Sequence, residues 1–136
     1  MRIIIIIIIL FCIFTKIGFS KEGSVIVLMY HRFDQNQYPS TNISTNLFRK
    51  HLEIIQSENF NVIGIDHLAN LLKEKKNLPN KTVVITVDDA YKSFFNNAYP
   101  ILKEFSYPFS IFVSTATISS EKNSDYMSWK MLKELS

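Results

Sequence analysis

Cysteine and histidine are scarce in this chain of 136 residues, and each shortage excludes a class of protein. The one cysteine, Cys12, excludes a disulfide framework and any multi-cysteine zinc site. His31, His51 and His67 are too far apart for the paired spacings of zinc motifs, so this chain alone cannot complete a histidine-based metal site. Basic residues exceed acidic ones by only three, which argues against a nucleic-acid partner.

Residues 1–20 have the layout of a secretory signal peptide. Arg2 gives a positive start, an apolar run extends from Ile3 to Phe14, and the small residues Gly18 and Ser20 fit cleavage after Ser20. The run is shorter than the ~20 apolar residues of a membrane-spanning helix. The alternative is an uncleaved N-terminal anchor, which would be the only contact with a membrane. We therefore predict an exported protein, periplasmic, extracellular or bound to the cell envelope, with one domain over residues 21–136.

The rest of the chain alternates apolar runs of strand length with helical apolar stripes, which indicates an α/β fold with a parallel sheet. The predicted strands cover residues 24–30, 60–65, 82–87 and 108–113, and the predicted helices cover 45–58, 66–76, 91–105 and 128–136. Pro100 should kink or restart the third helix. Ser44 or Thr45, Asp66 and Ser128 are the expected N-caps.

The distribution of apolar residues gives three further expectations. The run over residues 24–30 predicts a strand that is buried on both faces. Trp129 and the phenylalanines, among them Phe112, sit at helix or strand spacing and are expected in the core. The last helix reaches Ser136 just as its stripe is established, so we expect the chain to be truncated and a further strand to follow.

Two polar clusters follow predicted strands and should meet at one edge of the sheet, where parallel α/β proteins bind ligands. His31 ends the first strand, and Asp88 and Asp89 end the strand over residues 82–87. One carboxylate could bind a divalent metal while the other acts as a base on water. The alternatives remain open: an aspartate can simply cap the next helix, which the spacing alone favours, and His31 can be a hydrogen-bonded structural residue.

The segment Thr86-Val87-Asp88-Asp89-Ala90 resembles the first motif of the polysaccharide deacetylase (NodB homology) family, usually T-F-D-D-G. Residues 98–103, 108–113 and 126–135 resemble the stretches that follow this motif, and residues 27–31 resemble the first strand of the exported branch. The sequence departs from the motif at Ala90, where the family has glycine, and mildly at Val87. Alanine is tolerable there unless the backbone needs a positive φ.

The resemblance implies the N-terminal portion of a distorted (β/α) barrel that removes acetyl groups from an N-acetylated polysaccharide, with a divalent metal that is often zinc. It implies that Asp88 is the general base and Asp89 a metal ligand, and it leaves His31 as a residue at the edge of the site. The histidine pair that supplies the other ligands in the family does not occur in this sequence. We therefore expect one metal ligand here, with the remaining ligands missing from this chain.

Three hypotheses follow for the function. The first is a metal-dependent hydrolase of N-acetyl groups in carbohydrate metabolism, of which this chain is an incomplete part. The second is a truncated saccharide-binding module without catalysis. The third is a magnesium-dependent phosphotransfer domain that uses the acidic pair, which the export signal disfavours.

Overall fold

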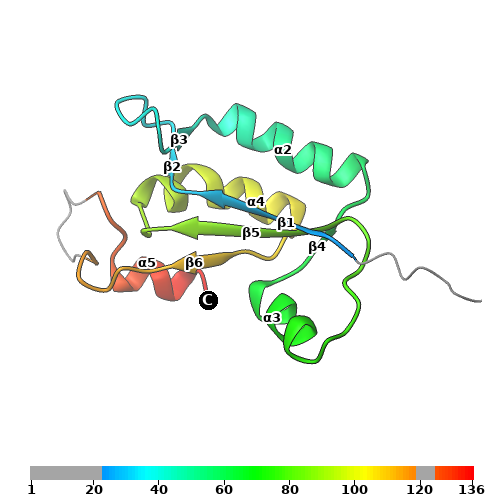
Figure 1. Ribbon diagram of the computed structural model, residues 1–136. Coiled ribbons are helices and arrows are strands. Elements are labelled where there is room, and N and C mark those ends of the chain that lie inside the picture. The colour runs from blue at the N-terminus through cyan, green and yellow to red at the C-terminus, as the bar shows by residue number, and fades with distance from the viewer. Residues whose placement is uncertain (1–22, 119–124) are drawn as a thin grey trace, which may run out of the picture.

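The computed structural model of the protein describes residues 23–118 and 125–136, so the predicted signal peptide over residues 1–20 lies outside the described residues. A parallel sheet is centred on β5 (Thr82–Asp88). The strand β1 (Val25–Tyr30) pairs with β5 along one side. The other side is shared by β4 (Asn61–Val62), which pairs with the start of β5, and β6 (Ser110–Phe112), which pairs with its end (Figure 1).

The helices connect these strands in the predicted order. They are α2 (Thr45–Ser57), α3 (Ile65–Lys73), the π-helical turn η1 (Phe94–Ala98), α4 (Tyr99–Phe105) and α5 (Trp129–Glu134). Two short strands that the sequence did not predict, β2 (Arg32–Phe33) and β3 (Asn42–Ile43), pair in parallel in the loop before α2. The predicted restart at Pro100 is confirmed, because this proline lies in the first turn of α4, directly after the π-helical turn.

Two of the three predicted N-caps are confirmed. The Ser44 hydroxyl accepts a hydrogen bond from the backbone nitrogen of Leu47, and the Ser128 hydroxyl accepts one from Met131. The prediction for Asp66 was wrong, because α3 begins one residue earlier and Gly64 is its N-cap. Asp66 lies in the first turn instead, where a negative charge still suits the helix dipole.

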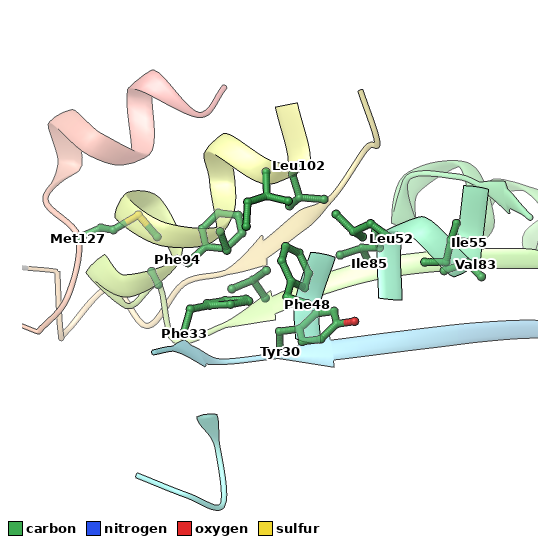
Figure 2. Packing of buried hydrophobic residues seen from close by; sticks show 14 residues of the cluster. Tyr30, Phe33, Phe48, Leu52, Ile55, Val83, Ile85, Phe94, Leu102 and Met127 are labelled. Carbon is green, nitrogen blue, oxygen red and sulfur yellow. The ribbon is translucent and has the colours of Figure 1, made fainter. Parts of the chain in front are cut away.

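The hydrophobic core lies between the sheet and the helices α2, η1 and α4. Phe48 and Leu52 point from α2 toward Ile85 of β5, and Phe94 and Leu102 close the core from η1 and α4 (Figure 2). All five side chains are fully or almost fully buried. This packing fixes the helices on one face of β5 and so determines where the end of that strand points. At the surface, the Arg49 guanidinium donates two hydrogen bonds to the Glu104 carboxylate, which joins α2 to α4 and lowers the pKa of Glu104.

The expectation that the strand over residues 24–30 is buried on both faces was wrong. Val27 and Met29 of β1 are half or more exposed. In the described part of the chain β1 pairs only with β5, so it is an edge strand of the sheet. Ile26, whose side chain points to the opposite face, is also 48% exposed. Phe112, which was also expected in the core, is the last residue of the short strand β6 and is 52% exposed.

Trp129 is also on the surface, with 62% of its area exposed, and so contradicts its predicted place in the core. It is the first residue of α5. The residues that pack on the core are Met131 and Leu132 of that helix and Leu135, its C-cap. Within residues 23–118 and 125–136, none of the helices combines the length and the apolarity that crossing a membrane requires.

Candidate active site

The acidic pair lies at the C-terminal end of the central strand. Asp88 is the last residue of β5 and is paired in register with Phe112 of β6. Asp89 and Ala90 then adopt left-handed backbone conformations, with φ of 65° and 55°. Two successive residues of this kind turn the chain sharply out of the sheet. The helical segment that follows has Ser93 in its N-cap position, so the structure does not place either aspartate there as a helix cap.

The register of the two longest strands brings His31 next to the acidic pair. Tyr30 is paired with Val87, so the residues that follow them, His31 and Asp88, lie side by side at the end of the sheet. The Nε2 atom of His31 lies 3.8 Å from Oδ2 of Asp88, and about a quarter of each side chain is exposed. Residues that are far apart in the sequence thus form one partly open cluster at the predicted edge of the sheet.

The segment after His31 is held against η1 by side chains that sequence reasoning missed. The backbone nitrogen of Phe33 donates a hydrogen bond to the Ser93 hydroxyl at 3.2 Å, and Nδ2 of Asn97 donates one to the Phe33 carbonyl at 3.1 Å. Ser93 and Asn97 are four residues apart, the spacing at which side chains share one helix face. The sequence feature that could have indicated this contact is the presence of two polar residues at this spacing beside the apolar stripe.

Arg32 is the second feature that the sequence did not single out. Its side chain is buried, and its guanidinium carbon lies 3.8 Å from the centre of the Tyr38 ring and 3.5 Å from that of Tyr91. It donates a hydrogen bond to Gln35 at 2.9 Å and lies 3.5 Å from the carboxylate of Asp125. The arginine therefore connects the loop before α2 with the chain that leaves the acidic pair.

The turn after the acidic pair is also fixed from its far side. The backbone nitrogen of Met127 donates a hydrogen bond to the Ala90 carbonyl, and that of Lys92 donates one to Asp125, both at 2.8 Å. Between these bonds the rings of Tyr91 and Tyr126 stack with centres 4.9 Å apart. Burial raises the pKa of Tyr91, with smaller contributions from its hydrogen bond to Tyr126 and from the charge of Asp89, while Arg32 acts in the opposite direction.

The donor set at this edge does not make a complete metal centre. A zinc site takes three or four protein ligands. The structure over residues 23–118 and 125–136 contains no group of three or more histidine, cysteine, aspartate or glutamate side chains close enough to hold an ion. Asp89 can contribute one carboxylate oxygen ligand, but the described residues do not fit a zinc ion by themselves.

Comparison with known proteins finds a family to which this part of the chain is similar. Residues 75–136, which include the acidic pair and the turn after it, match the sequence model of the polysaccharide deacetylase family. A poly-β-1,6-N-acetyl-D-glucosamine N-deacetylase of Staphylococcus aureus is 27% identical over 131 residues, an alignment that covers 85% of this chain and 45% of the relative. Over these residues the chain is similar to the polysaccharide deacetylase family.

Solved structures show the same fold over most of this chain. IcaB from Ammonifex degensii superposes with a TM-score of 0.73 at 27% identity, over 83% of this chain and 48% of that one. A de-N-acetylase from Aggregatibacter actinomycetemcomitans superposes with a TM-score of 0.66 at 25% identity, over 82% and 50%. The chain thus spans about half the length of these two proteins. Its sheet and helices form part of their (β/α) barrel, as the sequence predicted.

The departure from the polysaccharide deacetylase motif at Ala90 acquires a structural meaning here. Glycine is the residue that adopts positive φ without steric cost, and Ala90 sits at φ 55° while fully buried. The left-handed conformation costs a residue with a Cβ about 1–2 kcal/mol. Ala90 therefore keeps the backbone shape of the acidic turn at the expense of local strain.

Proposed function

We propose that this protein hydrolyses N-acetyl groups of a hexosamine polysaccharide, with its site at the carboxyl ends of β1 and β5. The observation that carries the proposal is the 3.8 Å separation of His31 Nε2 and Asp88 Oδ2, directly beside Asp89. An imidazole and two carboxylates at one open edge can accept one proton and deliver another. The family supports the same reaction class. A poly-β-1,6-linked N-acetylglucosamine is the substrate to test first, because the S. aureus relative is named for it.

The reaction requires water to attack the acetamide carbon and the carbon–nitrogen bond to break. In the proposal, the oxygen of the water bonds to the acetamide carbon. The Asp88 carboxylate accepts a proton from that water at the same time. His31, in its protonated form, donates a proton to the nitrogen as the bond breaks. The products are acetate and a free amine on the sugar. General acid and base groups of this kind each contribute about 10²–10⁴-fold to a rate.

Asp89 is proposed as one ligand of a divalent metal ion, with zinc as the first ion to test. In these hydrolases a metal would supply Lewis-acid chemistry at the carbonyl oxygen. The described residues lack a complete ligand set, so the roles of Asp88 and His31 are derived from their own positions. We also propose that the protein is exported, which rests on the N-terminal sequence pattern.

The test is the release of acetate from a β-1,6-linked N-acetylglucosamine pentamer by the full-length gene product, followed by proton NMR. We expect Asp88→Asn to lower kcat/KM by about 10²-fold or more, because a neutral amide cannot accept the proton. His31→Gln should cause a loss of similar size. The matched control is Asp66→Asn, an exposed aspartate on α3, which should retain the wild-type rate.

An Asp88→Asn variant as active as Asp66→Asn would contradict the assigned base. The second candidate function is a saccharide-binding module without catalysis, which the incomplete ligand set favours. It predicts that the wild-type protein binds the pentamer but releases no acetate from it at any zinc concentration.

A further inference from the structure

The residue directly after His31 is a buried cation. Arg32 is 8% exposed and is the only charged residue that the described part of the chain buries. Burying a charge costs free energy unless the charge is paired and hydrogen-bonded. The partners of Arg32 therefore show which segments this side chain holds together.

These partners come from three segments that are distant in the sequence. In the loop before α2, Gln35 accepts a hydrogen bond from the guanidinium at 2.9 Å. The Asp125 carboxylate lies 3.5 Å from the same guanidinium nitrogen, and the centre of the Tyr91 ring lies 3.5 Å from the guanidinium carbon. Tyr91 follows Asp89 by two residues, and the segment of Asp125 is joined to the acidic turn by two backbone hydrogen bonds of 2.8 Å. The arginine thus binds the acidic turn on two sides.

The backbone of Arg32 is fixed as well as its side chain. Its nitrogen donates a hydrogen bond to the Thr41 carbonyl at 3.1 Å, and the Tyr38 ring covers the guanidinium from the loop at 3.8 Å. Tyr30 on the other side of His31 is held in register on the central strand. His31 therefore lies between two fixed neighbours, and its direction at the end of β1 depends on where Arg32 is held.

The distance between the candidate catalytic groups is sensitive to this arrangement. The 3.8 Å between Nε2 of His31 and Oδ2 of Asp88 is close to hydrogen-bond reach. A misplacement of about 1 Å at reacting groups can cost about 10²-fold in rate. His31 belongs to one strand end and Asp88 to the other, so a contact that joins the two strand ends determines their separation.

We infer that Arg32 is a positioning residue that holds His31 and the acidic turn at the separation that proton transfer requires. It acts through the Tyr91 ring and through the peptide bond that it shares with His31, and it exchanges no proton itself. The inference rests on the proposed function, which assigns the proton transfers to His31 and Asp88. The planar guanidinium is essential to this role, because a lysine cannot stack between the two tyrosine rings in the same way.

The first measurement is kcat and KM for acetate release from the β-1,6-linked pentamer by variants of the full-length gene product. Arg32→Met should lower kcat about 10²-fold and change KM by less than about threefold, because a misplaced acid–base pair weakens the transition state more than the bound substrate. Arg32→Lys should retain about a tenth of the wild-type kcat. Leu68→Ala is the matched control. Leu68 is buried on α3 outside the core cluster, so its loss destabilises the protein but should leave kcat unchanged.

A double variant tests whether Arg32 acts through the Tyr91 ring. Tyr91→Leu removes the ring and should lower kcat by itself. The double variant Arg32→Met/Tyr91→Leu should then be no slower than the slower single variant, because residues that act as a unit are not additive. Losses that multiply in the double variant would show two independent roles and would overturn the inference. Circular dichroism confirms that each variant is folded.

Crystal structures of the wild type, Arg32→Met and Leu68→Ala give a readout that does not depend on hydrolysis. The separation of His31 Nε2 and Asp88 Oδ2 should lengthen by about 1 Å or more in Arg32→Met alone. If the wild type releases no acetate but this lengthening is found, the proposed hydrolysis fails and the positioning role stands. If acetate is released and Arg32→Met keeps the kcat of Leu68→Ala, the hydrolysis stands and the positioning role is overturned. If Arg32→Met does not fold, Arg32→Lys replaces it, and a wild-type kcat in that variant would overturn the inference.

Discussion

The guanidinium of Arg32 lies 3.5 Å from the centre of the Tyr91 ring, so the residue after His31 makes a cation–π contact with the residue after Ala90. The contact joins the two strand ends that carry the candidate catalytic groups. The second ring, that of Tyr38, covers the guanidinium from the loop before α2. A planar cation between two aromatic rings depends on the shape of arginine as well as on its charge.

Replacement of Arg32 should therefore destabilise the protein by more than a surface substitution does. We expect Arg32→Met to lower the free energy of unfolding by about 2–3 kcal/mol, because cation–π contacts of desolvated groups are worth about 2 kcal/mol or more. Arg32→Lys keeps the charge without the planar stack and should lose an intermediate amount. Urea unfolding followed by circular dichroism measures both. The exposed Lys50→Met variant on α2 should change by less than about 0.5 kcal/mol.

Ala90 provides a test of backbone strain. Ala90→Gly should leave stability within about 1 kcal/mol of wild type, because relief of the left-handed alanine offsets the added chain entropy of glycine and the lost buried methyl group. The matched control is Ala98→Gly. Ala98 is equally buried but has φ −100°, so its replacement should cost about 1.5–2 kcal/mol with no relief of strain. Equal losses in the two variants would contradict strain at Ala90.

The ionisation of the Tyr30 phenol should make the protein less stable in alkaline solution. Burial raises the pKa of Tyr30 to about 12, from about 10 in the unfolded chain. The native state keeps the phenol proton between pH 10 and 12 while the unfolded state loses it, so the free energy of unfolding falls as pH rises through this window. The contribution of Tyr30 is about 1–2 kcal/mol.

Urea titrations at pH 9.5 and 11.5 measure this effect. Tyr30→Phe should lose less stability between the two values than wild type does. Tyr99→Phe, on the less buried face of α4, is the control and should follow wild type. Identical pH dependence in Tyr30→Phe and wild type would show that another group dominates the alkaline transition.

Ser93 tests the link between β2 and η1. Ser93→Ala should lower the free energy of unfolding by about 1–3 kcal/mol, because the buried backbone nitrogen of Phe33 loses its acceptor. Ser57→Ala, at the exposed end of α2, should be nearly neutral. Because Phe33 lies two residues after His31, Ser93→Ala should also lower kcat for the proposed hydrolysis and change KM less.

The architecture could be predicted from the sequence because its signals are local. The β-branched run of residues 82–87 and the amphipathic stripe over residues 45–58 each determine one element, and the alternation of such elements determines a parallel sheet. The juxtaposition of His31 with Asp88 also followed, since parallel strands present their carboxyl ends at one edge. These inferences need only the period of the apolar residues and the order of the elements.

The parts that could not be predicted depend on contacts between distant segments. No sequence feature next to Arg32 predicts that the rings of Tyr38 and Tyr91 will enclose its guanidinium. The apolar pattern of β1 gives the strand correctly, but it cannot say that Val27 and Met29 stay exposed because β1 lies at the edge of the sheet. The positive φ of Ala90 depends on the turn and on the hydrogen bond from the backbone nitrogen of Met127. Both are present only in the folded chain.

The peptide group of Phe33 offers a spectroscopic reporter for the whole edge of the sheet. The amide proton of Phe33 is hydrogen-bonded to the hydroxyl oxygen of Ser93, the residue directly before η1. Exchange of that proton with deuterated solvent therefore requires η1 to move away from β2, and needs no strand to separate. The exchange rate of this single amide, compared with that of Ile85 in the central strand, would measure how often the helix side of the site opens while the sheet stays intact.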